Sequence, residues 1–138
     1  MPHSPRLHQG RLWLLNSAVG EFGCIDLAAG RFEPIAFCPG YARGMAFIDG
    51  HAVVGLSLPR GDRAFAGLPL EDNLQARKTD ARCGLAIFNL KTGDMNNWVR
   101  VEGVVRELYD VAALAGVRRP LLVGFKSDEV KRLISIED

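Results

Sequence analysis

The sequence predicts an all-β fold of about three four-stranded antiparallel units that follow one another along the chain. The first observation behind this prediction is an internal repeat, because the segment 24–31 (CIDLAAGR) recurs as 87–94 (IFNLKTGD). In both copies an apolar strand ends at Asp or Asn, which is followed by Leu, two further residues and Gly. Self-similarity of this kind indicates a modular β architecture.

The second observation is a set of apolar runs that each end at Ser, as expected of a central strand buried on both faces. They occupy 10–17, 50–57 and 120–127. Ser17 to Asp26 spans 9 residues but Ser57 to Asn89 spans 32, so the middle unit carries roughly 23 extra residues. With this insertion removed, the units recur every 40 to 50 residues or so, which is typical of β-propeller blades.

The predicted blades cover about 1–38, 39–102 and 103–138, as a single partial β-propeller domain. The middle blade is complete, and its Asp49-Gly50 pair is a strong hairpin signal. Its insertion, about 58–82, contains a segment, 70–77, that favours a short helix. The first blade is expected to have an inner strand near His3. The second should contain strands at 43–48, 51–57, 83–90 and 95–101. The third should contain strands at 108–112, 120–127 and 132–136, and it lacks a fourth strand. A Greek-key sandwich is the alternative all-β arrangement.

Composition bounds the class of protein. The chain has 138 residues, 48% of them hydrophobic, which is enough for one domain with a core. Its 17 basic and 16 acidic residues leave a net charge of +1, so charge gives no general attraction to nucleic acid or membrane. Three cysteines without a C-x-x-C pair indicate free thiols. No apolar run approaches roughly 20 residues and no apolar signal core is present, so we expect a cytoplasmic protein.

Three blades cannot close a ring, because propellers use roughly four to eight. An open arc would expose apolar blade faces, at a cost of about 25 cal/mol per Å². We therefore expect two copies to associate as a homodimer with a six-bladed outline.

Residues at equivalent places on the inner strands are the candidates for a ligand site. Aligning these strands brings His3, Arg43 and Tyr109 to one level, with Ser4, Gly44 and Asp110 one step later. An imidazole, a guanidinium, a phenol and a carboxylate in a central channel suit a small anionic or polyhydroxylated molecule. In the competing interpretation, Arg43 and Asp110 form ion pairs between blades and His3 belongs to a loose terminus.

The chain contains no G-x-S-x-G elbow, no H-E-x-x-H pair and no Walker loop. The sequence therefore favours a non-catalytic ligand-binding or interaction module without a cofactor. Neither nucleic acid nor a membrane is an expected partner.

Several segments resemble an uncharacterised bacterial family of propeller-like proteins. They are 1–6, 10–17, 40–47, 82–85, 102–105 and 107–111. Members of that family are longer, so this chain resembles their C-terminal part, and no activity is carried over from them. More distantly, the blade pattern is similar to gluconolactonase-like six-bladed propellers, which bind a divalent metal at the channel mouth. That resemblance implies an alternative function as a metal-dependent lactonase-like hydrolase. A truncated product, aggregating through open blade edges, is a third interpretation.

Overall fold

The computed structural model describes residues 1–59, 67–120, 123–124, 126 and 128–132. Within this part of the chain, no helix combines the length and the apolar character that a membrane span requires.

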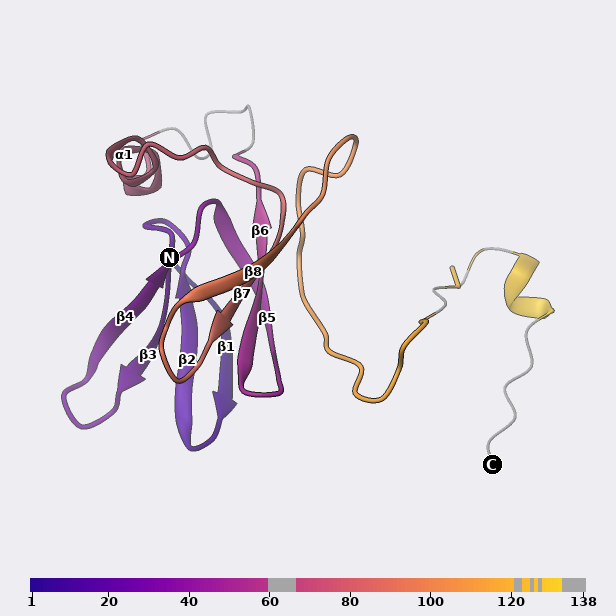
Figure 1. Ribbon diagram of the computed structural model, residues 1–138, viewed down its shortest axis with the longest axis horizontal. Coiled ribbons are helices and arrows are strands. Elements are labelled where there is room, and N and C mark those ends of the chain that lie inside the picture. Colours follow the sequence, from indigo (N-terminus) through magenta and orange to yellow (C-terminus); the bar gives the residue numbers. More distant parts are fainter. Residues whose placement is uncertain (60–66, 121–122, 125, 127, 133–138) are drawn as a thin grey trace.

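In the described part of the chain, eight strands form two four-stranded antiparallel sheets, and in each sheet the strands lie in chain order (Figure 1). Sheet 1 consists of β1 (Pro2–His8), β2 (Arg11–Asn16), β3 (Glu21–Asp26) and β4 (Arg31–Phe37). Sheet 2 consists of β5 (Tyr41–Ile48), β6 (His51–Ser57), β7 (Gly84–Asn89) and β8 (Met95–Arg100). The fold is therefore all-β, as predicted, and its open sheets fit a partial propeller-like arrangement.

The hairpin between the third and fourth strands has the same chemistry in both sheets. In sheet 1 the Asp26 carboxylate accepts hydrogen bonds from the backbone N–H groups of Ala28 and Ala29, at 2.9 and 3.0 Å. In sheet 2 the Asn89 amide oxygen does the same two and three residues further on, at 2.9 and 3.3 Å. Gly30 and Gly93 follow with φ of +65° and +79°, a conformation that glycine adopts without a steric penalty. These Asx turns explain why Asp or Asn precedes Gly in the repeated segment.

The two sheets also share their pairing register. Pro2 lies opposite Asn16, and forty positions later Ala42 lies opposite Leu56. On the outer strands the offset is 63 positions. Ile25 lies opposite Phe32 in sheet 1, and their counterparts, Phe88 and Met95, lie opposite each other in sheet 2. A position in sheet 1 therefore has a defined counterpart in sheet 2.

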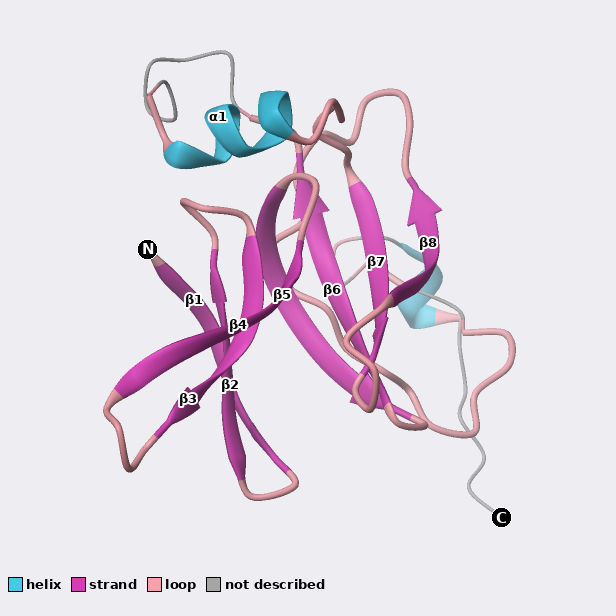
Figure 2. Ribbon diagram, turned by 60° about the vertical axis from the view of Figure 1, so that its left-hand side comes forward, coloured by secondary structure: helices cyan, strands magenta, loops and turns pink. Residues whose placement is uncertain are grey.

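The core lies between the sheets, and aromatic rings join them. The Phe22 ring on β3 is stacked on Trp13 and on Phe88 of β7, each with ring centroids 5.2 Å apart. Phe22 and Phe88 are both 0% exposed. The remaining buried apolar members of this cluster are Leu15, Cys24, Cys38, Ala42, Met45, Ala52, Val54, Leu56 and Ala86. The sheets lie beside one another (Figure 2), and the inner strands β1 and β5 are in contact.

The insertion carries helix α1 (Pro69–Ala76), close to the helix predicted at 70–77. The buried side chains of Leu70 and Leu74 form a small second core with Tyr41. The backbone N–H of Leu70 donates to the Ala18 carbonyl at 2.9 Å. The helix therefore lies against the turn between β2 and β3 in sheet 1 and against the start of β5 in sheet 2.

The third unit differs from the prediction. The residues predicted as its inner strand, 108–112, are described and have no strand conformation. The strand predicted at 120–127 is described only in part and without strand conformation, and 133–136 lie outside the described residues. A short 3₁₀ helix spans Asp128–Lys131. Residues 106–111 nevertheless run alongside sheet 2, through contacts with β5 and β6 that are described below.

Candidate functional site

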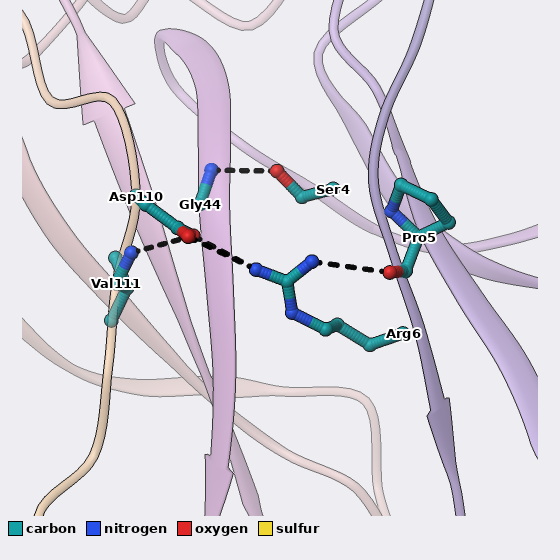
Figure 3. Close-up of polar contacts among 6 residues, drawn as sticks. All are labelled: Ser4, Pro5, Arg6, Gly44, Asp110 and Val111. Carbon is teal, nitrogen blue, oxygen red and sulfur yellow. Dashed lines mark hydrogen bonds and ion pairs between the residues drawn. The ribbon is translucent and has the colours of Figure 1, made fainter.

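Both inner strands are interrupted at the same level by an irregularity in pairing. The register shifts between His3 and Arg6 on β1, and between Ala42 and Met45 on β5. Ser4 and its counterpart Gly44 both have positive φ, +51° and +81°. Such bulges bend a strand and change the direction of the side chains that follow. The two bulges contact each other, because the Gly44 N–H donates to the Ser4 hydroxyl at 2.8 Å (Figure 3).

Glycine at position 44 allows the following segment to approach β5 closely. A Cβ at this position would lie 2.5 Å from the Asp110 Cα and 2.6 Å from the Val111 backbone nitrogen, both far inside van der Waals contact. Ser4, Gly44 and Asp110 therefore lie next to one another, in the order predicted for equivalent inner-strand positions. Figure 3 shows these residues with the segment that carries Asp110 running beside β5.

Two serine hydroxyls join successive inner segments. The buried Ser17 hydroxyl donates to the Ala42 carbonyl at 2.5 Å. Its counterpart Ser57 donates to the Leu108 carbonyl at 3.2 Å and accepts from the Leu108 N–H at 2.9 Å. The Leu58 N–H also donates to the Arg106 carbonyl at 2.9 Å. Residues 106–111 thus take the place beside sheet 2 that β5 takes beside sheet 1, although they lack strand conformation.

An ion pair crosses this junction. The Arg6 guanidinium donates to both carboxylate oxygens of Asp110, at 3.0 and 3.2 Å, and also to the Pro5 carbonyl (Figure 3). The side chains are 39% and 65% exposed, so the pair is solvated. The alignment of the inner strands did not single out Arg6, because its counterpart on β5 is Ala46, which carries no polar group.

Arg43 and Tyr109 form the second contact among the predicted residues. The Arg43 guanidinium carbon lies 5.0 Å from the centroid of the Tyr109 ring, within the range of a cation–π interaction. The Tyr109 side chain is 63% exposed. Together with the Arg6–Asp110 pair, this contact places two guanidinium groups, a phenol and a carboxylate where β1, β5 and residues 106–111 meet.

His3 is directed elsewhere. Its ring lies edge-on against Tyr41, with centroids 5.5 Å apart. Its Nδ1 atom is buried, and within the described residues it has no hydrogen-bond partner. Of the predicted site residues, Ser4, Arg43, Tyr109 and Asp110 are therefore grouped in the structure, whereas His3 packs against β5 through Tyr41.

A polar cleft of about 390 Å³ lies beyond the end of α1, and the sequence did not suggest it. Its lining includes Lys78, Arg82 and Arg100 together with Asp80 and the exposed indole of Trp98. These residues come from the insertion and from β8. The repeat pattern carries no information about the insertion, and no motif marks the cleft.

The cysteines are free and buried. Burial, reinforced by the Glu21 carboxylate, raises the pKa of the Cys38 thiol, and desolvation also raises the pKa of Cys83 against the opposing effect of Arg106. Both thiols are therefore protonated at neutral pH and unsuited to nucleophilic chemistry. The described residues contain no group of three or more His, Cys, Asp or Glu side chains placed to hold a metal ion.

The raised pKa of Cys38 predicts a loss of stability in alkali. In the unfolded chain the thiol ionises above its ordinary pKa, whereas in the native state it stays protonated. Its contribution is thus fully present at neutral pH and falls above about pH 8.5, by about 1.4 kcal/mol per pH unit. Urea unfolding at pH 7.5, 9 and 10 should show a shallower decline for Cys38→Ala than for the wild type. Parallel declines of the two proteins would contradict this prediction.

Comparison with known proteins gives one match. No curated protein and no solved structure matches the chain. A model of one family matches residues 1–123, which include both sheets, helix α1 and the junction of Arg6, Arg43, Tyr109 and Asp110. Because the match covers most of the sequence, this chain belongs to the uncharacterised family described as Domain of unknown function (DUF4915).

Proposed function

We propose that this protein is a non-catalytic ligand-binding module of partial β-propeller form, acting as a homodimer. Its ligand is a small anionic or polyhydroxylated molecule, held where β1, β5 and residues 106–111 meet. The observation that supports this site is the presence of two partly exposed guanidinium groups, Arg6 paired with Asp110 and Arg43 lying over Tyr109.

The Arg6–Asp110 pair is well suited to exchange with a ligand. An exposed ion pair contributes only about 0–1 kcal/mol to stability. Breaking the Arg6–Asp110 pair so that a ligand carboxylate or phosphate can bind Arg6 therefore costs little free energy. Guanidinium groups bind such anions through two parallel hydrogen bonds. The released Asp110 carboxylate can accept hydrogen bonds from ligand hydroxyls, and the Tyr109 phenol can donate to them or accept from them. The site therefore supplies donors for an anionic end and both kinds of group for hydroxyls.

D-Gluconate is a suitable probe because it is both anionic and polyhydroxylated. By isothermal titration calorimetry, Arg43→Ala should weaken gluconate binding by about 10- to 100-fold, since a charged hydrogen bond contributes roughly 1.5–3 kcal/mol. Arg31→Ala is the matched control, because Arg31 is an exposed arginine paired with Glu33 on β4. Absence of binding, or equal affinities for the wild type and Arg43→Ala, would overturn the proposal. Hydrolysis of gluconolactone that a chelator abolishes would instead favour the metal-dependent lactonase-like alternative.

A further inference from the structure

The polar cleft beyond the end of α1 lies between two separate parts of the molecule. The connection from α1 to β7 contributes residues 78–82, and the edge strand β8 contributes Trp98 and Arg100. Because Trp98 and Arg100 are two residues apart on one strand, their side chains share a face of sheet 2. The volume of about 390 Å³ is sufficient for one small molecule.

Hydrogen bonds at both ends hold residues 78–82 in place. The Thr79 N–H donates to the Leu74 carbonyl of α1 at 3.1 Å, and the Arg82 N–H donates to the Pro39 carbonyl at 2.9 Å. Across the same connection, the Arg82 guanidinium donates to the Thr79 hydroxyl at 3.5 Å. Pro39 lies between β4 and β5, so the connection is tied to the sheets as well as to the helix. The polar cleft is therefore formed before a ligand binds, which lowers the entropic cost of binding.

Positive charge exceeds negative charge in the polar cleft. Its lining contains three cations and one carboxylate, namely Lys78, Arg82, Arg100 and Asp80. Within the described residues, Lys78, Arg82 and Asp80 take part in no ion pair. Nε of Arg100 lies 2.9 Å from the Glu102 carboxylate, so its two terminal nitrogens remain for a ligand. A phosphate carries about two negative charges and three acceptor oxygens, and it can therefore use more than one of these cations.

Trp98 gives the polar cleft an aromatic wall. It is 61% exposed, whereas the other tryptophan, Trp13, is 3% exposed in the core. An exposed indole beside cationic groups can bind the flat face of an aromatic ring by stacking. The exposed Asp80 carboxylate can accept hydrogen bonds from hydroxyl groups. The lining thus offers a group for each part of a nucleotide, because the indole suits the base, the carboxylate suits the sugar and the cations suit the phosphate.

We propose that the polar cleft binds a nucleoside monophosphate. The base stacks on Trp98, and the phosphate is held by the cations of the connection and by Arg100. This site shares no residue with the junction of β1, β5 and residues 106–111, so the inference goes beyond the proposed function and does not depend on it. Stacking and charge act on the same ligand, and a molecule that lacks either the ring or the anion should bind more weakly.

Isothermal titration calorimetry with AMP, adenosine and inorganic phosphate tests this requirement for both parts. The wild type should bind AMP at least about tenfold more tightly than either fragment, since each fragment lacks one of the two contacts. Adenosine or phosphate that binds as tightly as AMP would overturn the proposal, as would absence of AMP binding at millimolar concentration. Tryptophan fluorescence gives a second readout, because Trp13 is buried and a change in emission on adding AMP reports on Trp98.

A substitution of the aromatic wall locates the base. Trp98→Leu should weaken AMP binding by about 5- to 100-fold, the usual effect of losing one stacked base. Asn97→Ala is the matched control, because Asn97 is the preceding exposed residue of β8 and its side chain is directed to the opposite face. The control should bind AMP like the wild type. Equal affinities for Trp98→Leu and the wild type would contradict stacking on the indole.

A substitution of one cation locates the phosphate. Arg82→Gln should weaken AMP binding by about 10- to 100-fold, and it keeps the backbone hydrogen bond to Pro39. Arg31→Gln is the control, an exposed arginine on β4 outside the polar cleft. Circular dichroism checks that all variants are folded. Wild-type affinity in Arg82→Gln would show that this cation does not hold the phosphate and would overturn the proposed site.

Competition with gluconate separates the polar cleft from the junction. An excess of gluconate should not displace AMP, because the two sites share no residue. Displacement would place both ligands in one site and would overturn the proposal. The affinity for AMP is also measured without gluconate, so failure of the junction site and failure of the polar cleft give different results.

Discussion

Phe22→Ala is expected to lower the free energy of unfolding by about 3–5 kcal/mol, the usual cost of removing a fully buried aromatic side chain. The Phe22 ring is stacked between Trp13 of its own sheet and Phe88 of sheet 2, with both centroid distances at 5.2 Å. Its removal therefore leaves a cavity and also breaks the aromatic contact between the two sheets. Since a small domain has a stability of about 5–15 kcal/mol, this loss is a large share of the total.

Urea denaturation measures this effect, with the dependence on urea concentration checked for two-state behaviour. Phe32→Ala is the control, because Phe32 is an aromatic residue of the same sheet that is only half-buried. The control should lose less than half as much stability as Phe22→Ala. Equal losses at the two positions would show that the stacked rings do not hold the sheets together.

Gly44→Ala is expected to cost about 2–6 kcal/mol and to release residues 106–111 from sheet 2. The residue has φ of +81°, which costs a non-glycine residue roughly 1–3 kcal/mol. In addition, the new methyl group would meet the Asp110 backbone at 2.5 Å, and overpacking of this kind costs about 1–3 kcal/mol. Backbone atoms cannot rotate aside, so the whole segment must move.

Gly50→Ala separates these two contributions. Gly50 has a similar φ of +72°, but a Cβ there meets no atom within 4 Å. The control should therefore lose only the conformational part, with the 106–111 segment still in place. Thermal unfolding gives the stability, and limited proteolysis reports whether the chain near Arg106 has become accessible. A Gly44→Ala protein as stable and as protected as Gly50→Ala would show that the close approach of Asp110 does not matter.

The sheets were predictable because local chemistry determines their turns. Asp26 and Asn89 each satisfy the backbone of their own hairpin, and Asp49-Gly50 specifies the turn between β5 and β6. Within each sheet the strands lie in chain order, and every connection between neighbouring strands is short except the one between β6 and β7, which carries the insertion. The prediction of an inner strand at 108–112 was wrong. That segment contacts sheet 2 through the side chain of Ser57 and through Gly44, without strand conformation. Apolar pattern alone does not distinguish such a segment from a strand.

The site was predictable only in part, for a related reason. The equivalence of Ser4, Gly44 and Asp110 comes from spacing, and the structure places the three together. Arg6 was missed because its counterpart in sheet 2 is Ala46, so the comparison of equivalent positions showed no shared polar group there. The orientation of His3 toward Tyr41 depends on packing between the two sheets, which no local pattern encodes.

The connection between the second and third strands differs in length between the two sheets, and this difference shows where the fold accepts inserted residues. Four residues link β2 to β3, whereas 26 residues link the equivalent pair β6 and β7, yet both pairs are antiparallel neighbours in the same register. Closing the longer loop costs only about 1.7 kcal/mol more, by the logarithmic dependence of closure entropy on length. Inserting residues at this position therefore lowers the stability of the fold only slightly. New recognition elements can be acquired or exchanged there while the scaffold keeps its pairing.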